Sequence, residues 1–576
     1  MTLPLLALGF LVVLALGYRF HSGFVARQLR LDAGATTPAV RVNDGSDFVP
    51  TPPFYLFAQH FSAIAAAGPI AGPILACRSF GWAPCLLWIG IGVVFIGAVH
   101  DFVALVASVR HGARSIAEIT REQLGVRAGR TFLAFLGIAL VYVIVAFTDS
   151  TAQTFIKGDE AFEGEVTPFN PGGAVALASL LYLLLGVTLG VTRKVAPKLP
   201  LWLLTVVFVP ATFLLCWCGT IPGLSQLLVF APEHSYRIWC AAILVYCGVA
   251  SLLPVGLLLQ PRGYLGGFIL YASLAAGLAG IALGERHGLK IEAPAFRGFD
   301  VGGPTGMLFP FLFVTIACGA CSGFHGLVCS GTTSKQVARE PHARAVGYGA
   351  MLAEAFVALI ALVIVMTTRP EKLVGASAGR IYGDGIGRFL SFVVGSEHER
   401  FVTTFGAMAF STFVFDTLDV CTRLGRYIVQ ELVGWKGRGG MLGAAALTLA
   451  APAAVLAFAK PGDSLRFWTL FGASNQLLAA LTLLTLAVWL RRSGRRYAFA
   501  LAPMAFVLVI TFWALVRIAW SSFGSAAAQI RAHESFGVEL ANGVASVALL
   551  ATSLFLVAAA APRLRTRVAQ AGPEAR

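Results

Sequence analysis

Charged side chains are scarce in this chain. Asp, Glu, Lys and Arg make up 12% of its 576 residues, whereas hydrophobic types make up 57%. A soluble domain has about 25% charged residues, so this chain cannot cover a water-facing surface of its own size. The scarcity excludes a soluble enzyme, a coiled coil, a disordered scaffold and a nucleic-acid-binding protein. The net charge is +15, but the arginines lie in short runs between apolar segments, which is typical of membrane proteins.

Cysteines and catalytic motifs are also few. Ten cysteines in 576 residues are too sparse for a disulfide scaffold. Cys318 and Cys321 form a C-x-x-C with His325 four residues later. A structural zinc site needs four ligands, and only three are near in sequence, so we expect no metal and no cofactor. The sequence has no Walker A loop, no G-x-S-x-G and no H-E-x-x-H, so it predicts neither a nucleotide-driven pump nor an enzyme.

Long apolar runs dominate what is present. A membrane helix needs roughly 20 mostly apolar residues, and the sequence has about fifteen such runs. They lie at 3–18, 54–77, 82–108, 131–154, 173–191, 199–219, 236–258, 264–283, 307–330, 345–367, 401–421, 441–459, 467–490, 497–519 and 540–561. The first run lacks a basic start and a small-residue cleavage site, so we interpret it as a helix rather than a signal peptide. The sequence therefore predicts an all-α polytopic membrane protein with no soluble domain between its helices.

Alternate loops between these helices differ in charge. One set, which includes 109–130, 491–496 and the tail from 562, holds 28 Lys and Arg against 8 Asp and Glu. The other set, which includes 284–306 and 368–400, holds 13 Lys and Arg against 15 Asp and Glu. Cytoplasmic loops carry the excess of Lys and Arg. We therefore expect the N-terminus outside and the C-terminus in the cytoplasm, and a short amphipathic cytoplasmic helix in the basic stretch after residue 109.

The run at 54–77 carries helix breakers in its middle. Pro69 and Pro73 each remove a backbone donor, and a mid-helix proline costs about 3 kcal/mol or more. Gly68 and Gly72 precede them and lower the resistance to unwinding. Two Gly-Pro pairs four residues apart therefore predict a break in this helix.

The run at 307–330 is interrupted in a similar way. Gly319, Gly323 and Gly326 fall in mid-span, beside Ser322 and His325. The loop charges place residue 54 inside and residue 307 outside, so the two broken helices start on opposite sides of the membrane. Two such helices indicate an inverted-repeat transporter with its site at the midplane, although glycine also serves close packing of membrane helices.

Ionisable side chains within the apolar runs are rare and expensive, because a central Asp costs about 2.5–3.5 kcal/mol on insertion scales. Each is either part of a proton or ion relay, or a neutral or paired group that bridges helices. Asp419 lies four residues before Arg423 and could pair with it. Asn475 and Gln476 could bind substrate or link helices. The acids and histidines concerned are Asp101, Asp149, Glu354, Asp416, Asp419, His60, His100 and His325.

Several long segments resemble one known family. They are A-Q-H-F-S-A-I-A-A-A-G-P-I-A-G-P-I-L-A, G-A-V-H-D-F, S-L-L-P-V-G-L-L-L-Q-P-R-G-Y-L, F-P-F-L-F-V-T-I-A-C-G-A-C-S-G-F-H-G-L-V-C-S-G-T-T-S-K and L-F-G-A-S-N-Q-L-L-A-A. The chain resembles the carbon starvation protein A (CstA) family over about residues 50 to 490, in the family's order. It departs from the family pattern at Gln59, where a second His is usual, and at His100, where Gln is expected.

The resemblance implies a bacterial inner-membrane secondary transporter with a LeuT-like five-plus-five inverted repeat. Family members are linked to uptake of peptides during starvation, and some to pyruvate uptake. On this basis we expect a first repeat at 54–235, linking helices and an outer loop at 236–306, and a second repeat at 307–490. Residues 1–53 and 491–576 are then peripheral. The helices between 236 and 283 either sit between the repeats or include the fifth helix of the first.

These observations together predict alternating access around a solute held between the two breaks. The predicted partners are that solute and the lipid bilayer, with no nucleic acid and with the oligomeric state left open. Peptide is the expected substrate on family grounds, pyruvate is the alternative, and an uncoupled channel is a further one. A proton, or else sodium, is the expected coupling ion. The predicted substrate-binding residues are Gly68, Pro69, Gly72, Pro73, Ser322, Gly323, Phe324 and His325, and the predicted coupling or gating residues are His60, Asp101, Asp149, Glu354, Asp416 and Asn475.

Overall fold

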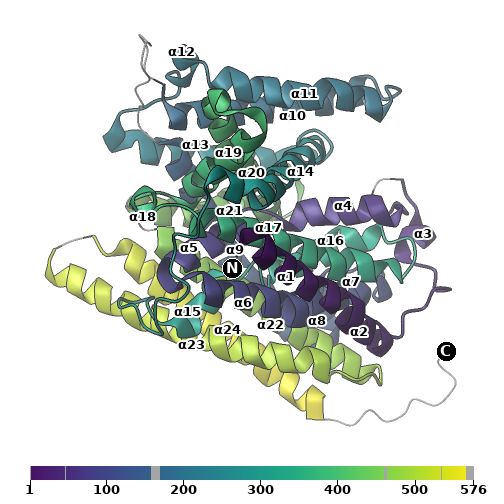
Figure 1. Cartoon of the computed structure of the whole chain (residues 1–576). Helices are drawn as coiled ribbons and strands as arrows, with labels where there is room; N and C mark the ends of the chain where they lie inside the picture. Colours follow the sequence, from purple (N-terminus) through teal and green to yellow (C-terminus); the bar gives the residue numbers. More distant parts are fainter. Residues whose placement is uncertain (1, 46, 157–168, 460–463, 534, 566–576) are drawn as a thin grey trace.

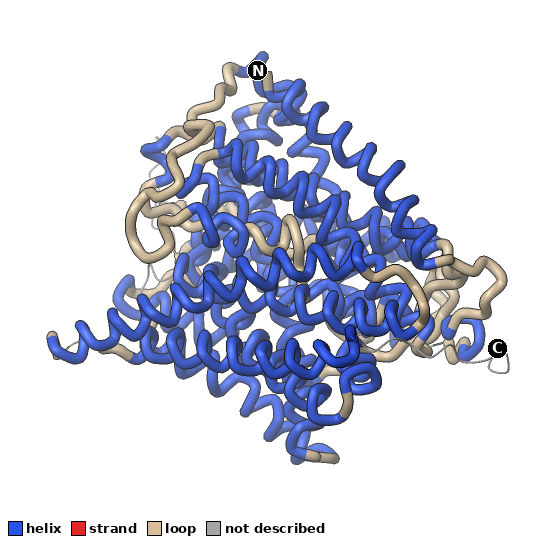
Figure 2. The backbone as a smooth tube through the Cα atoms, turned by 90° about the horizontal axis from the view of Figure 1, so that it is seen from below, coloured by secondary structure: helices blue, strands red, loops and turns tan. Residues whose placement is uncertain are grey.

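The structure is a computed structural model that describes residues 2–45, 47–156, 169–459, 464–533 and 535–565. The described residues form helices joined by loops (Figure 2), and β-type pairing among them is confined to isolated bridges such as Thr51 with Val337 and Asp300 with Met307. The all-α class predicted from the apolar runs is therefore confirmed.

Thirteen helical segments of the described residues are long and apolar enough to cross a membrane. Several are built from consecutive helices that include π- or 3-10 turns. The thirteen segments are α1–η1–α2 (Leu3–Leu29), α6–η2–α7 (Trp82–Arg110), α9 (Val126–Phe155), α10 (Pro171–Val195), α11 (Leu201–Gly219), α13 (Pro232–Leu252), α14–η3 (Leu259–His287), η5–α17 (Arg344–Met366), η6–α20 (Ser396–Val433), α21 (Gly437–Phe458), α22 (Ser464–Arg492), α23 (Ala498–Arg531) and α24 (Gly537–Arg565). With the two broken spans described below, they correspond one for one to the predicted apolar runs.

The shorter helices lie between these spans. They are α3 (Pro38–Val42), α8 (Ile116–Leu124), α12 (Pro222–Ser225), α18 (Pro370–Leu373) and α19 (Ala378–Val394). The predicted amphipathic helix after residue 109 is α8, which begins with a capping box made by Ser115 and Glu118. The expected loop at 368–400 is not a simple loop, because α19 occupies its middle. The connections between the predicted runs 131–154 and 173–191 and between 441–459 and 467–490, and the tail from 562, lie partly outside the described residues.

Helix α20 is much longer than the predicted run at 401–421, because it continues to Val433. Arg423 lies in this extension and donates to the carbonyls of Ala250 and Leu253 at 2.8 and 2.7 Å, so the polar part of the helix is anchored to its neighbours. Asp416 is consequently in mid-helix. The sequence predicts Asp149 and Asp416 each about five residues before the end of an apolar span; Asp149 lies near the end of α9 (Val126–Phe155), whereas α20 continues well past Asp416.

The first broken span consists of α4 (Pro53–Ile64) and α5 (Gly68–Phe80), which meet at an angle of 46°. The break lies at Ala65–Ala67 rather than at the predicted Gly68–Pro73. Pro69 stands in the first turn of α5, where a backbone donor has no helical partner to lose. Pro73 lies inside the helix. The prolines therefore determine where the second half starts, and they do not unwind it.

The second broken span consists of α15 (Leu308–Thr315) and α16 (Phe324–Gly331), separated by the non-helical segment Ile316–Gly323. The predicted break is confirmed here, except that His325 belongs to the first turn of α16. The two breaks pack directly on each other. A Cβ at Gly68 would clash with Cys318, a Cβ at Gly72 would lie 2.7 Å from the carbonyl oxygen of Thr315, and one at Gly319 would lie 3.6 Å from Pro69 Cα.

The remaining helices surround this centre. Helices α23 and α24 run side by side along one side of the molecule, and α10 and α11 lie together on the opposite side (Figure 1). Helix α14 packs against α4, α17 and α20, while α22 packs against α16, α7 and α9. The central helices are therefore enclosed by neighbours, and α22 is the most completely buried of the long spans.

We expect Gly72→Ala to destabilise the protein, because the new methyl group would meet backbone rather than a movable side chain. Overpacking of this kind costs about 1–3 kcal/mol. Gly524→Ala is the matched control, since Gly524 is a helical glycine with open space around its Cβ position, and Ala there removes the helix penalty of Gly. Thermal unfolding in detergent should show a lower Tm for Gly72→Ala and an equal or higher Tm for Gly524→Ala. Equal Tm values for both variants would show that the two breaks do not pack closely.

Candidate functional site

A chain of buried ionisable side chains connects the two broken spans. Asp101 of α7 lies at its centre, with Oδ1 at 2.7 Å from His100 Nδ1 and Oδ2 at 2.9 Å from His325 Nδ1. The other ring nitrogen of His325, Nε2, lies 3.3 Å from Glu354 Oε2 on α17. All four side chains are at most 2% exposed. Three of the predicted coupling and substrate-binding residues, Asp101, His325 and Glu354, are thus in one cluster.

The local structure of α7 brings Asp101 to this position. The π-turn η2 (Val93–Gly97) immediately precedes α7 (Ala98–Arg110), and such turns insert one extra residue and re-aim the side chains that follow. Gly97 permits the close approach, since a Cβ there would lie 2.5 Å from the carbonyl oxygen of Ala320 in the second break. A Cβ on Gly326 of α16 would lie 3.2 Å from His100 Cε1. Small residues on both sides therefore allow α7 and α16 to pack together.

His60 joins the cluster from the first broken span. It lies one turn before the end of α4. Its Nδ1 is 2.9 Å from Thr333 Oγ1, and its Nε2 is 3.9 Å from Cys329 Sγ, which in turn lies 3.5 Å from the Asp101 carbonyl oxygen. Within the described residues, His60, Asp101 and Cys329 are close enough to share a metal ion. Both carboxylate oxygens of Asp101 already bond histidines, so we assign no metal there.

The protonation state of His325 determines how the two carboxyl groups beside it are paired. An imidazolium at His325 donates from both ring nitrogens and can face two carboxylates, whereas a neutral imidazole donates from only one. Glu354 is fully buried, and neither of its oxygens has a hydrogen-bond partner within the described part of the chain beyond the 3.3 Å contact with His325. Because an isolated buried charge is costly, neutral His325 requires a proton on Glu354. The arrangement can therefore store a proton and exchange it between an imidazole and a carboxyl group.

A second set of polar residues, on α22, satisfies the backbone of the second break. Asn475 Oδ1 accepts from the Phe324 backbone N–H at 2.9 Å, and Asn475 Nδ2 lies 3.1 Å from Ser322 Oγ. Gln476 Nε2 and Trp468 Nε1 donate to the carbonyls of Phe313 and Thr315 at 3.1 and 3.0 Å. Of the two alternatives for Asn475 and Gln476, the structure favours linkage of helices over substrate binding.

A third cluster surrounds Arg262, a residue that the apolar-run prediction placed in a loop. It lies in the first turn of α14 and is fully buried. Its Nη2 lies 2.5 Å from Asp416 Oδ1 and 3.1 Å from Asp419 Oδ2. Tyr246 donates to Asp419 Oδ2 at 2.8 Å. The expected pairing of Asp419 with Arg423 is therefore wrong, because α14 supplies a closer guanidinium that no local sequence spacing reveals.

Asp149 has no part in either ionic cluster. Tyr236 of α13 donates to its Oδ1 at 2.5 Å, and Gln153 Nε2 donates to both carboxylate oxygens at 2.9 Å. These neutral partners hold Asp149 at the contact between α9 and α13. The bond with Tyr236 links α9 to α13.

The predicted substrate-binding residues do not line an open space. Gly68, Pro69, Gly72, Pro73, Ser322 and Gly323 are buried where the two breaks and α22 touch. A Cβ on Gly323 would clash with the backbone of Asn475 and Ala479. Of the eight residues only Phe324 is partly exposed. Nearby, Gln59 and Ala63 of α4 are exposed and Ser62 is partly exposed, as are Ala66 in the first break and Phe324 and Leu327 of α16. The accessible positions therefore lie along these two half-helices and at the first break.

Comparison with known proteins now adds to this geometry. The family model described as "Carbon starvation protein CstA" matches residues 2–384 and 371–514, which is most of the chain. The chain belongs to the carbon starvation protein CstA family. The resemblance inferred from the five sequence segments is confirmed, and this CstA-family chain is a multi-pass membrane transporter rather than an enzyme.

Two curated relatives of this CstA-family chain come from Escherichia coli (strain K12). The "Peptide transporter CstA" is 32% identical over 87% of this chain and 78% of the relative. The "Pyruvate/proton symporter BtsT" is 30% identical over 87% of this chain and 80% of the relative. Among solved structures, MhsT in complex with L-phenylalanine matches at 13% identity with a TM-score of 0.47, covering 88% of this chain and 98% of MhsT.

We expect Arg262→Met to destabilise the protein strongly, because it leaves Asp416 and Asp419 as uncompensated buried carboxylates. Removing one partner of a buried ion pair costs about 3–5 kcal/mol. Adding Asp416→Asn and Asp419→Asn to the same variant should recover much of that loss. Arg380→Met is the control, since its pair with Asp384 is about half exposed and exposed pairs contribute about 0–1 kcal/mol. Thermal unfolding of the four proteins tests the network. No recovery in the triple variant would contradict charge compensation as its role.

Proposed function

We propose that this chain is a secondary active transporter that imports small peptides across the bacterial inner membrane by alternating access, coupled to protons and used during carbon starvation. The observation that carries the proposal is the buried chain from His60 through Asp101 and His325 to Glu354. It touches both broken spans and ends on a carboxyl group with no permanent counterion. Such a chain supplies proton acceptors where the moving helices meet.

Coupling follows from which helices hold the members of this chain. His325 lies on α16, Asp101 on α7 and Glu354 on α17. Any movement of α16 away from α7 or α17 separates an imidazolium from a carboxylate in the buried interior, which is unfavourable unless the charges are neutralised first. Proton transfer from His325 to Glu354 neutralises both groups and so removes both ion pairs of His325, while Asp101 keeps its contact with His100. Release of the proton from the cluster and reorientation of the helices are therefore linked steps.

The accessible faces of α4 and α16 are proposed as the substrate pathway. Gln59 and Ala63 are exposed, and Ser62, Phe324 and Leu327 are partly exposed. This pathway begins at the end of α4 that follows segment 19–53, which has four Arg and three Asp, and at the end of α16 that precedes the basic segment 331–344. Under the positive-inside rule these segments are cytoplasmic. We therefore assign an inward-facing state, with the N-terminus outside and the C-terminus in the cytoplasm.

Asp416 favours peptide over pyruvate as the substrate. Its side chain is 23% exposed, whereas its partner Arg262 is fully buried. It lies next to Gly266, while the adjacent Gly267 lies next to Ser62 of the accessible face. The group that faces the pathway is thus an anion, which attracts the ammonium group of a peptide and repels a lone carboxylate. One relative is named as a peptide transporter and another as a pyruvate/proton symporter, so pyruvate is the alternative substrate in the tests below.

We also propose that α14 is the last helix of the first repeat, which would therefore extend past the expected boundary at residue 235. In an inverted five-plus-five repeat, the first broken span corresponds to the second, and the two closing helices correspond to each other. Helix α14 packs against α4, α17 and α20, as α22 packs against α15, α7 and α9. Under this correspondence, each packing partner of α14 has its counterpart among the packing partners of α22. The coupling residue Glu354 and the pathway residue Asp416 then lie in the second repeat, and Asp101 lies in the first.

Proton coupling predicts a specific defect for Glu354→Gln. In proteoliposomes a gradient of one pH unit drives at most about tenfold accumulation for one proton per substrate. The parent should approach this accumulation of a labelled dipeptide, whereas Glu354→Gln should only equilibrate it and should retain counterflow exchange. Glu371→Gln, at an exposed position on α18, is the matched control and should behave as the parent does. Uptake by the parent that ignores pH but requires sodium would refute proton coupling.

Recognition of the peptide ammonium predicts a loss of affinity on N-acetylation. Hydrogen bonds to charged groups contribute about 1.5–3 kcal/mol, so an N-acetylated dipeptide should bind purified protein roughly 10- to 100-fold more weakly than the free dipeptide. Asp416→Asn should weaken binding of the free dipeptide and leave that of the acetylated one unchanged. Equal binding of both dipeptides, or binding of pyruvate but not of dipeptides, would rule out this assignment.

A further inference from the structure

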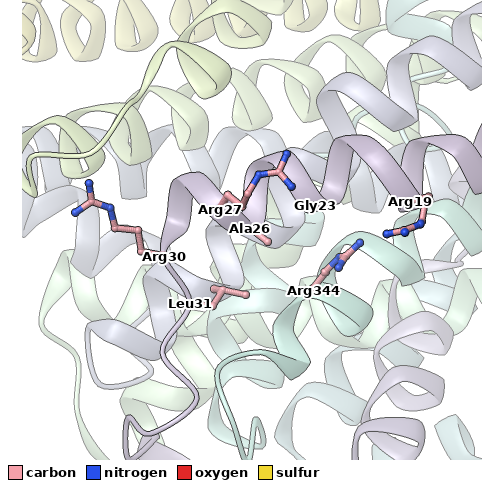
Figure 3. A pocket seen from close by; sticks show the side chains of 7 residues that line it. All are labelled: Arg19, Gly23, Ala26, Arg27, Arg30, Leu31 and Arg344. Atoms are coloured by element: carbon pink, nitrogen blue, oxygen red, sulfur yellow. The ribbon is translucent and has the colours of Figure 1, made fainter.

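A cavity of about 430 Å³ lies at the end of the first span, away from the accessible face described above. Four arginines line it: Arg19 in η1 (Gly17–His21), Arg27 in α2 (Ser22–Leu29), Arg30 directly after α2, and Arg344 at the start of η5 (Arg344–Gly349). Figure 3 shows Arg19 directed toward Arg344 at one end, with Arg30 at the other end of the cavity. The proposed transport function uses none of these residues.

Two of the guanidinium groups, those of Arg27 and Arg344, approach each other beside Gly23. Gly23 is at the centre of the cavity wall, and its Cβ position is 3.7 Å from Arg344 Nη2 and 3.8 Å from Arg27 Nη1. Arg344 is held in place, because Nε donates to Ser22 Oγ at 2.8 Å and Nη2 donates to the Tyr18 carbonyl at 3.0 Å. Its guanidinium also lies 5.0 Å from the centre of the Tyr18 ring. One of the cations is therefore fixed in position before any ligand binds.

These positive charges have no counterion in the described part of the chain. None of the four arginines forms an ion pair there, and the neighbouring acids are used elsewhere. Glu340 pairs with Arg110 at 2.6 and 2.8 Å, and Asp32 Oδ1 accepts from the Gly34 backbone N–H at 2.8 Å. Guanidinium groups that share a cavity repel one another, and a phosphate group can accept hydrogen bonds from several of them at once. The cavity thus has the charge and the donors of a phosphate site.

The position of the cavity decides which phosphate compound fits. The segment Leu3–Leu29 has 27 residues, about 40 Å of helix at 1.5 Å per residue, which exceeds the roughly 30 Å hydrocarbon thickness. Its last turns, which carry the arginines, therefore reach the headgroup layer. The preceding turns expose apolar side chains: Val12, Val13, Leu16 and Phe20 are 47–66% exposed. An acyl chain can lie on that surface while its headgroup occupies the cavity.

We propose that this cavity binds the phosphate headgroup of an anionic phospholipid, with the lipid tails along α1 (Leu3–Leu16). Basic pockets between membrane helices on the cytoplasmic side are suited to such headgroups. A zwitterionic lipid is a poorer ligand, because its ammonium group would be repelled by the arginines. The headgroup would join α2 to η5 by bonding Arg27 and Arg344 together.

Native mass spectrometry of the purified full-length protein in detergent tests this site. The protein is titrated with phosphatidylglycerol and with phosphatidylcholine. We expect the parent to prefer phosphatidylglycerol by roughly tenfold or more, since each Arg near the membrane surface contributes about 1 kcal/mol. Arg19→Gln with Arg27→Gln should abolish that preference. Gly23→Leu, which fills the cavity without changing the charge, should do the same. Arg193→Gln with Lys194→Gln is the control, because it removes two exposed positive charges at the end of α10.

The outcomes separate a lipid site in this cavity from a free-anion site and from general attraction of lipid to a basic protein. Retention of the preference in both the Arg19/Arg27 variant and Gly23→Leu would overturn the proposal, as would its equal loss in the Arg193/Lys194 control. In a further arm, inorganic phosphate competes with phosphatidylglycerol. Displacement of the lipid by millimolar phosphate would identify a site for free anions and overturn the lipid assignment, whereas resistance to phosphate would support it. Thermal unfolding verifies that each variant is folded before titration.

Discussion

Backbone groups that are freed where a helix breaks inside lipid must find partners within the protein, because the bilayer core offers no water. This constraint governs the centre of the molecule. The second break exposes carbonyls at Phe313 and Thr315 and the N–H of Phe324, and side chains of α22 bond all three. The first break packs its glycines directly on the second. The two interrupted spans are therefore held as one unit, and α22 must be fully buried to serve them.

The two ionic clusters near this centre differ in the chemistry of their cations. Arg262 cannot lose its proton in a protein, so its pairs with Asp416 and Asp419 are permanent and suit it to holding helices together and orienting a carboxylate. His325 can be charged or neutral, so its contacts with Asp101 and Glu354 change when a proton moves. The proposed proton coupling therefore uses the histidine cluster, and the proposed substrate recognition lies beside the arginine cluster. Burying charge is costly in both clusters. The contacts of Arg262 are nevertheless fixed, whereas those of His325 depend on its protonation.

Close approach of helices makes both clusters possible. Gly97 and Gly326 allow α7 and α16 to bring Asp101 and His325 within 2.9 Å. Gly266 allows Asp416 to reach α14, since a Cβ there would lie 3.1 Å from its carboxylate. Small residues at helix contacts are a general feature of membrane proteins. In this protein they place ionisable groups from different spans at bonding distance, so the glycine content of the sequence and the site are physically connected.

The sequence by itself determined the positions of the apolar helical segments, the two interrupted helices and the identity of the buried acids and histidines, because these depend on composition along a single segment. It could not determine partners. Local spacing favoured Arg423 for Asp419, whereas the fold supplies Arg262 from a helix more than 150 residues away in sequence. It also suggested that Gly68 and Gly323 line a cavity, whereas helix packing buries them. Pairing and exposure depend on which faces of distant helices meet, and only the tertiary structure decides that.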